Sequence, residues 1–171
     1  MRMNLARGAA SAQKKMMIPI LDLFEAHLDV SDLSRSMAFF GETLGLQLAH
    51  VCLVRRVAFF WIGKKGQAML GIWEVPSCLP RMNAHIAFRV DFSDLIESPG
   101  RLHAANVVPM DFDGRSTSEP VVLAWMPAAA LYFRDPDNNL LEFLSMLPEP
   151  PQPDLGVVSW NQWKQQHEPT A

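Results

Sequence analysis

The sequence contains two segments with the same order of elements, and this duplication constrains the fold more than any other feature. Each segment opens with an alanine, a histidine and an aliphatic residue, at Ala26-His27-Leu28 and at Ala84-His85-Ile86. Hydrophobic periodicity then predicts one helix followed by three strands in both segments. Repeated units of this kind usually stack and bury a shared core. We therefore expect an α+β fold in which two βαβββ modules form a cupped, barrel-like mixed sheet.

In the first module a strand is predicted at 24–30 and a helix at 31–44, with Ser31 as the N-cap and Gly45 as the stop. Apolar residues recur along that helix at spacings typical of one buried face. Three strands are expected after it, at 47–53, 56–62 and 67–73. The last two are joined by a Gly-Lys-Lys-Gly turn.

The second module repeats this order with a larger insertion. A strand at 84–91 precedes a weaker helix at 92–105, which Pro99-Gly100 is expected to distort. Further strands are predicted at 107–112, 121–125, 129–134 and 140–145. The last two flank Asp135-Pro136-Asp137-Asn138-Asn139, a run of turn-forming residues.

These patterns divide the chain into an N-terminal tail (1–20), a duplicated domain (21–147, with modules 21–75 and 83–147) and a proline-rich tail (148–171). A short helix is expected in the proline-rich tail, with Ser159 as its N-cap. Trp160, Trp163 and His167 would share one face of that helix. We expect the helix to pack back on the domain, and a contact with another subunit is the alternative.

Composition narrows the class of function. Hydrophobic residues make up 49% and charged residues 19%, so the chain can fill a core and wholesale disorder is excluded. The net charge of −3 argues against a nucleic-acid binder. The longest apolar stretch, 120–133, is broken by prolines and too short to span a membrane, and 1–15 lacks the apolar centre of a signal peptide. Two cysteines, Cys52 and Cys78, are too few for a disulfide scaffold, so we expect a reducing, cytoplasmic compartment.

Three side chains could hold a metal ion. His27 and His85 both lie inside apolar strands at equivalent points of the duplication, although a lone strand histidine is more often a hydrogen-bonded core residue. Glu142 lies among large apolar residues, so it either faces water on an edge strand or must be paired or bind a cation. If the modules face each other, two imidazoles and one carboxylate converge as a ligand set for a divalent ion. Such a set leaves positions open for water or substrate.

Other residues could contact a substrate. Tyr132 could donate a hydrogen bond or act as a general acid if it points into the cup. Arg89 shares a strand face with His85 and could bind an anionic group, or it could be an ordinary surface cation. Trp61 belongs to an aromatic set that is more often core than substrate box. Aligning the two modules matches Trp61 with Tyr132, and Gly71 with Glu142.

These residues resemble the vicinal oxygen chelate superfamily, which includes glyoxalase I, fosfomycin-resistance thiol transferases, extradiol dioxygenases and bleomycin-resistance proteins. The resemblance spans about 23–146 and is carried by the starts of both modules, the first helix, and the segment 131–143 with its Asp-Pro-Asp turn and Leu-Glu pair. It implies paired modules forming a cupped sheet around a metal site. The family's usual ligands fall on His27, His85 and Glu142, and the metal could be Zn, Ni, Mn or Fe.

Departures from the family bear on the activity. The acid that glyoxalase I carries at the end of module one is Gly71 here, and Glu74 should lie on the opposite strand face. Ala130 and Asp29 replace a serine and a threonine of the fosfomycin enzymes, and Leu70 replaces a histidine of the extradiol dioxygenases. Tyr132, ten residues before Glu142, matches the tyrosine of both these groups.

The resemblance implies a metal-dependent, glyoxalase-like enzyme that acts on a small oxygen-rich substrate by bidentate chelation to a divalent metal. The reaction could be that of a lyase, a transferase or a dioxygenase. One alternative is a non-catalytic, small-molecule (drug) binding protein of the bleomycin-resistance type, and another is an extradiol-type dioxygenase. We expect a homodimer whose partner is a small-molecule substrate, without nucleic acid or membrane.

Overall fold

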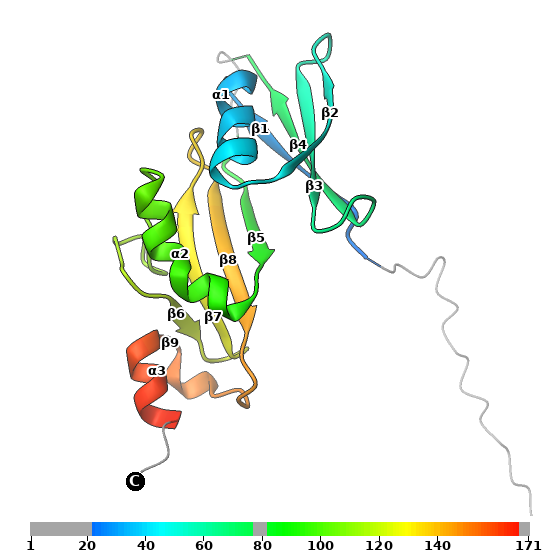
Figure 1. The fold of residues 1–171 in the computed structure, drawn as a ribbon. Coiled ribbons are helices and arrows are strands. Elements are labelled where there is room, and N and C mark those ends of the chain that lie inside the picture. Colours follow the sequence, from blue (N-terminus) through cyan, green and yellow to red (C-terminus); the bar gives the residue numbers. More distant parts are fainter. Residues whose placement is uncertain (1–21, 77–81, 168–171) are drawn as a thin grey trace, which may run out of the picture.

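The two predicted modules are present in a computed structural model, which describes residues 22–76 and 82–167 (Figure 1). Module one consists of β1 (Glu25–Val30), α1 (Leu33–Ala38), the π-helical η1 (Phe39–Thr43), β2 (Gln47–Cys52), β3 (Val57–Ile62) and β4 (Ala68–Glu74). Module two consists of β5 (His85–Arg89), α2 (Phe92–Ala104), β6 (Val121–Leu123), β7 (Ala128–Arg134) and β8 (Leu140–Met146). The C-terminal segment adds η2 (Pro153–Leu155), β9 (Val157–Ser159) and α3 (Trp160–His167). The α+β class and the βαβββ duplication are confirmed.

Each module forms its own mixed sheet, and the strand order is the same in both. The first sheet has the order β1-β4-β3-β2, and the second has the order β5-β8-β7-β6-β9. The first strand of each module pairs in parallel with the last, and the other pairs are antiparallel. The sheets are cupped rather than joined into a closed barrel. In Figure 1, α1 lies against the first sheet and α2 against the second.

One apolar core spans both modules. It includes Phe40 and Phe60 from module one, and Leu131 and Phe133 from module two, all almost completely buried. Since side chains alternate along a strand, the residues between these core positions lie on the opposite sheet face. Within 22–76 and 82–167 no helix is long and apolar enough to cross a bilayer.

Some predicted boundaries were wrong, and each error has a physical reason. The N-cap of α1 is Asp32, whose Oδ1 accepts a hydrogen bond from the Arg35 amide at 2.9 Å, because Ser31 is engaged by module two instead. The strand expected at 107–112 is reduced to isolated bridges at Met110. Pro109 has no amide hydrogen to donate to a ladder.

The expected helix at 31–44 changes to a π-helix after Ala38. Here Phe39 and Phe40 are both buried, with ring centroids 5.3 Å apart. The helix ends before Gly45, whose φ of +70° terminates it as predicted.

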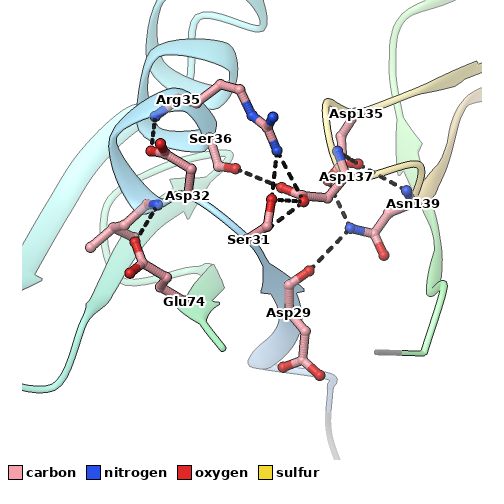
Figure 2. Close-up of polar contacts among 10 residues, drawn as sticks. Asp29, Ser31, Asp32, Arg35, Ser36, Glu74, Asp135, Asp137 and Asn139 are labelled. Carbon is pink, nitrogen blue, oxygen red and sulfur yellow. Dashed lines mark hydrogen bonds and ion pairs between the residues drawn. The ribbon is translucent and has the colours of Figure 1, made fainter. Parts of the chain in front are cut away.

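The Asp-Pro-Asp turn of module two docks on the start of α1 (Figure 2). Asp137 accepts a hydrogen bond from the Ser31 amide at 3.0 Å and another from the Ser31 hydroxyl. The Ser36 hydroxyl lies 3.2 Å from the other carboxylate oxygen, and Arg35 forms an ion pair at 3.0 Å. The side chain of Asp137 is only 3% exposed, so these contacts are largely shielded from solvent. We call this contact between the Asp-Pro-Asp turn and the start of α1 the clasp.

Asn139 extends this clasp to three strands. Its amide oxygen accepts from the Ala84 amide at 3.0 Å, immediately before β5, and its amide nitrogen lies 3.4 Å from the Asp29 carbonyl in β1. The same amide nitrogen donates a hydrogen bond to the Asp135 Oδ2 at 2.8 Å. One turn therefore ties together the ends of β1, β5 and β8, which carry His27, His85 and Glu142.

The proline-rich tail packs back on module two, as predicted. Ser159 caps α3 by accepting from the Gln162 amide at 3.2 Å, and Trp163 is fully buried in the core. The structure adds a strand that the sequence did not indicate. This strand, β9, pairs with β6 and covers the outer edge of the second sheet.

We expect Asp137→Asn to lower the free energy of unfolding by about 2 kcal/mol, because it removes a buried charge with several hydrogen bonds. Urea denaturation followed by circular dichroism measures the change. Asp113→Asn is the matched control: the exposed Asp113 side chain pairs with the nearby, exposed Arg115, and its loss should cost less than about 0.5 kcal/mol. Equal losses in the two variants would contradict the clasp.

The same clasp predicts a pH dependence. Burial alone would raise the pKa of Asp137, but hydrogen bonds from Ser31 and Arg35 and the Arg35 charge lower the pKa overall. A depressed folded-state pKa stabilises the protein above the ordinary carboxyl pKa of about 4, and this stabilisation is lost as the pH falls through the folded-state value. The stability difference between wild type and Asp137→Asn, measured by denaturation at several pH values, should therefore shrink below about pH 4.

Candidate metal centre

The residues predicted to bind a metal lie on the sheet faces opposite the helices. On the first sheet, His27 in β1 is directly opposite Gly71 in β4. On the second sheet, Glu142 in β8 is directly opposite Tyr132 in β7. The neighbouring residues in each strand enter the core, so alternation directs these side chains to the opposite faces.

His85 and Glu142 form a close pair. The His85 Nε2 lies 3.0 Å from the Glu142 Oε2. The Glu142 side chain is 5% exposed, whereas the His85 side chain is 49% exposed. The carboxylate is therefore buried, and the imidazole that contacts it is accessible from solvent. The other carboxylate oxygen, Oε1, is buried and has no hydrogen-bond partner among the described residues. A buried acceptor left in this state is costly unless a ligand or ion satisfies it.

Burial changes the pKa values of Glu142 and Tyr132. Desolvation raises the pKa of Glu142, while the charge and hydrogen bond of His85 and the nearby Tyr132 hydroxyl act in the opposite direction. Burial also raises the pKa of Tyr132, and the Glu142 carboxylate raises it further. Tyr132 therefore remains a neutral hydroxyl at physiological pH, suited to donating a hydrogen bond.

His27 does not join this pair within one chain. The described residues contain no group of three or more His, Cys, Asp or Glu side chains that could hold a metal ion. The Trp73 Nε1 donates to the His27 Nδ1 at 2.8 Å, and the His27 Nε2 lies 2.9 Å from the Glu25 Oε1. The structure therefore brings together His85 and Glu142, and leaves His27 on the first sheet.

Gly71 leaves room for the His27 ring. A Cβ atom at position 71 would lie 3.0 Å from the His27 Cδ2, 3.1 Å from the His27 Nε2 and 3.2 Å from Phe59. The strand register corrects the match of Gly71 with Glu142. His27 is opposite Gly71, but His85 is opposite Leu140 and Glu142 is opposite Ala87, so the residue of β4 that corresponds to Glu142 is Trp73. Glu74 lies elsewhere, as expected: it accepts from the Leu33 amide at 2.7 Å and pairs with Arg56.

The structure also places Trp61 and Arg89, the residues predicted to contact a substrate. The strand register corrects the match between Trp61 and Tyr132: Trp61 is opposite Met69, whereas Tyr132 is opposite Glu142. Both connections have five residues, 63–67 and 135–139, so the two pairs differ in their distance from the turn. Arg89 is exposed at the end of β5, about 13 Å along the strand from His85. It lines a cavity of about 450 Å³ between the modules.

Sequence reasoning missed what surrounds His27. Trp73 and Glu25 are its hydrogen-bond partners, and the Arg55 guanidinium lies 4.7 Å from the centre of the Trp73 ring. Strand alternation already placed Glu25 on the face of His27. Nothing in the sequence indicated that the indole of β4 would reach the imidazole of β1, because that contact depends on the pairing register.

The donor set at His85 and Glu142 fits a divalent metal ion. An imidazole nitrogen and a carboxylate are ordinary ligands of Zn, Mn, Fe and Ni, and the unsatisfied Oε1 supplies a further acceptor. His27 fits less well as it stands, because both of its ring nitrogens have partners.

Comparison with known proteins decides the family. The profile described as the Glyoxalase/Bleomycin resistance protein/Dioxygenase superfamily matches residues 23–143. The chain belongs to this superfamily. That match bears out the resemblance of the sequence and covers both modules but not β9 and α3. No curated protein matches the chain.

Several solved structures of this superfamily's fold are similar to the chain. An integron cassette protein from the mobile metagenome of the Halifax Harbour sewage outfall is 30% identical, with a TM-score of 0.64 over 74% of this chain and 100% of that one. The fosfomycin resistance protein FosX from Listeria monocytogenes, complexed with Mn(II) and sulfate, is 26% identical (TM-score 0.53, covering 78% and 94%). Lactoylglutathione lyase from Agrobacterium tumefaciens, at 21% identity, shares the fold (TM-score 0.57, covering 75% and 96%).

We expect Gly71→Ala to displace the rings of His27 and Phe59 and to lower the free energy of unfolding by about 1 kcal/mol, since the new methyl group enters filled space. Thermal and urea denaturation measure this. Gly100→Ala is the control, because its Cβ would meet nothing within 4 Å inside α2. That change should instead stabilise the protein by up to about 1 kcal/mol. The same sign for both variants would contradict the packing at Gly71.

Proposed function

We propose that the protein is a metal-dependent, glyoxalase-like enzyme that acts on a small oxygen-rich substrate by bidentate chelation to a divalent metal. The observation that carries the proposal is the His85–Glu142 pair, in which a buried carboxylate oxygen has no partner among the described residues. A structural carboxylate in an apolar strand would normally be fully hydrogen-bonded. A carboxylate oxygen without a hydrogen-bond partner, beside a half-exposed imidazole, is instead typical of a site that binds an ion or a ligand.

The proposed ligands are His85 and Glu142 from one chain and His27 from a second copy. Within one chain the three residues form no common group. In a two-fold dimer, however, a contact from module one of either copy to module two of the other occurs twice. Each dimer would then contain two complete sites. This proposal keeps all three predicted ligands and gives the expected homodimer a function.

When bound, the metal would act as a Lewis acid toward two neighbouring substrate oxygens and stabilise the negative charge that forms on them. Tyr132 would donate its hydroxyl proton as a hydrogen bond to a substrate oxygen, since its raised pKa keeps it neutral. Arg89 and Trp61 are the proposed substrate contacts, for an anionic group and an apolar part respectively. The small number of cysteines fits a reducing, cytoplasmic compartment.

Metal analysis tests this proposal. Purified full-length protein dialysed against Mn²⁺ or Zn²⁺ should retain about one ion per chain, and His85→Ala and Glu142→Gln should each lower the affinity at least tenfold. His103→Ala is the matched control, since His103 is an exposed helix residue, and it should leave metal content unchanged. Retention of the metal by the Glu142→Gln variant would contradict the proposed site.

A non-catalytic binding protein is the second candidate, favoured by the aromatic residues on the first sheet. Phe59 and Trp73 pack at right angles there, with centroids 6.4 Å apart, and His50 stacks on Phe59. This surface could hold a flat ligand without a metal. Ligand affinity that is unchanged by a chelator, in protein lacking bound metal, would favour this function over the enzyme.

A further inference from the structure

Both ring nitrogens of His27 are engaged, and their partners are of opposite kinds. The Trp73 indole nitrogen lies 2.8 Å from Nδ1, and a carboxylate oxygen of Glu25 lies 2.9 Å from Nε2. Turning the ring over would place carbon atoms at both contacts. The orientation of the imidazole is therefore fixed by two hydrogen bonds at once.

These partners also fix the position of the proton. An indole N–H can only donate, so the Nδ1 that faces Trp73 must offer a lone pair. A neutral imidazole then carries its hydrogen on Nε2, where the Glu25 carboxylate accepts it. All the donors and acceptors of this group are matched in a single tautomer.

The indole is itself held in place. The Arg55 guanidinium lies over its ring at 4.7 Å, and Phe59 packs against it at 82°. In the ladder, Trp73 is opposite Asp29 of β1, two residues beyond His27, so backbone pairing sets its distance from the imidazole. The hydrogen bond therefore depends on several contacts within module one.

This arrangement is the reverse of that usual for a metal-binding histidine. A ligating imidazole offers the lone pair of one nitrogen to the metal and donates the hydrogen of the other to an acceptor. Here the hydrogen is on Nε2, and moving it to Nδ1 would set two N–H groups against each other at Trp73. Nδ1 cannot serve as the ligand instead, because the indole covers it.

We infer that Trp73 is a positioning residue that locks His27 in the tautomer unable to bind a metal through Nε2, so that His27 becomes a ligand only when this hydrogen bond is released. The metal role of His27 rests on the proposed function; the locked tautomer rests on the geometry alone. Metal capture then begins at His85 and Glu142, and Trp73 limits the contribution of His27 to affinity.

Two measurements on the full-length protein test this inference. In metal-free wild type, a ¹H–¹⁵N spectrum of the histidine rings should show His27, assigned by its loss in His27→Gln, with its hydrogen on Nε2. In Trp73→Phe the signals should move toward a mixture of tautomers. Mn²⁺ titration by calorimetry should then give a dissociation constant about threefold to tenfold lower for Trp73→Phe than for wild type, the equivalent of one net hydrogen bond.

Trp125→Phe is the matched control, because Trp125 is exposed on the turn between β6 and β7 and the chemical change is the same. It should alter neither the His27 spectrum nor Mn²⁺ affinity. A wild-type spectrum with the hydrogen on Nδ1, or Mn²⁺ binding weakened by Trp73→Phe, overturns the inference. If Trp73→Phe does not fold, Trp73→Leu replaces it: leucine also lacks the indole N–H, so it should likewise tighten Mn²⁺ binding, and weaker binding overturns the inference.

These outcomes separate the inference from the proposed function. If neither protein binds Mn²⁺ but His27 is locked on Nε2 and released in Trp73→Phe, the tautomer lock is supported and the metal-dependent function fails. If Mn²⁺ binds wild type through His85 and Glu142 but Trp73→Phe leaves the His27 tautomer unchanged, the proposed function is supported and the tautomer lock fails.

Discussion

The buried contact between Asp137 and the start of α1 determines how the two modules sit against each other. The carboxylate satisfies Ser31, Ser36 and Arg35 in module one, while the adjacent Asn139 binds the backbone before β5 and at the end of β1. Of the strands that carry the candidate ligands, β1 ends beside this turn, and β5 and β8 begin there. The Asp-Pro-Asp sequence that marks the family therefore has a structural explanation here: it fixes the relative position of three strands rather than performing chemistry.

The candidate metal centre is divided unequally between the modules. Module two holds His85 and Glu142 in contact, with a buried oxygen that lacks a partner among the described residues. Module one holds His27 in a complete set of hydrogen bonds with Trp73 and Glu25. In the proposed function, His85 and Glu142 bind the ion first, and His27 of a second copy joins them after exchanging its partners.

Much of the fold could be predicted from the sequence, because it follows from local patterns. The duplication, the period-two strands and the glycine after the first helix gave the correct elements in nearly the correct places. The errors came where a distant residue competes for a local group. Ser31 is a good N-cap by itself, but Asp137, 106 residues away, takes its amide and hydroxyl, and Asp32 caps the helix instead.

The sequence by itself determined the two modules and the chemical kind of the candidate ligands. These depend on residue type and on strand alternation, which are local properties. Only the tertiary structure decided that Glu142 meets His85, that Gly71 makes room for an imidazole, and that Trp73 holds His27. Those contacts cross from one strand to another, so they depend on register and on the docking of the modules, which no single segment specifies.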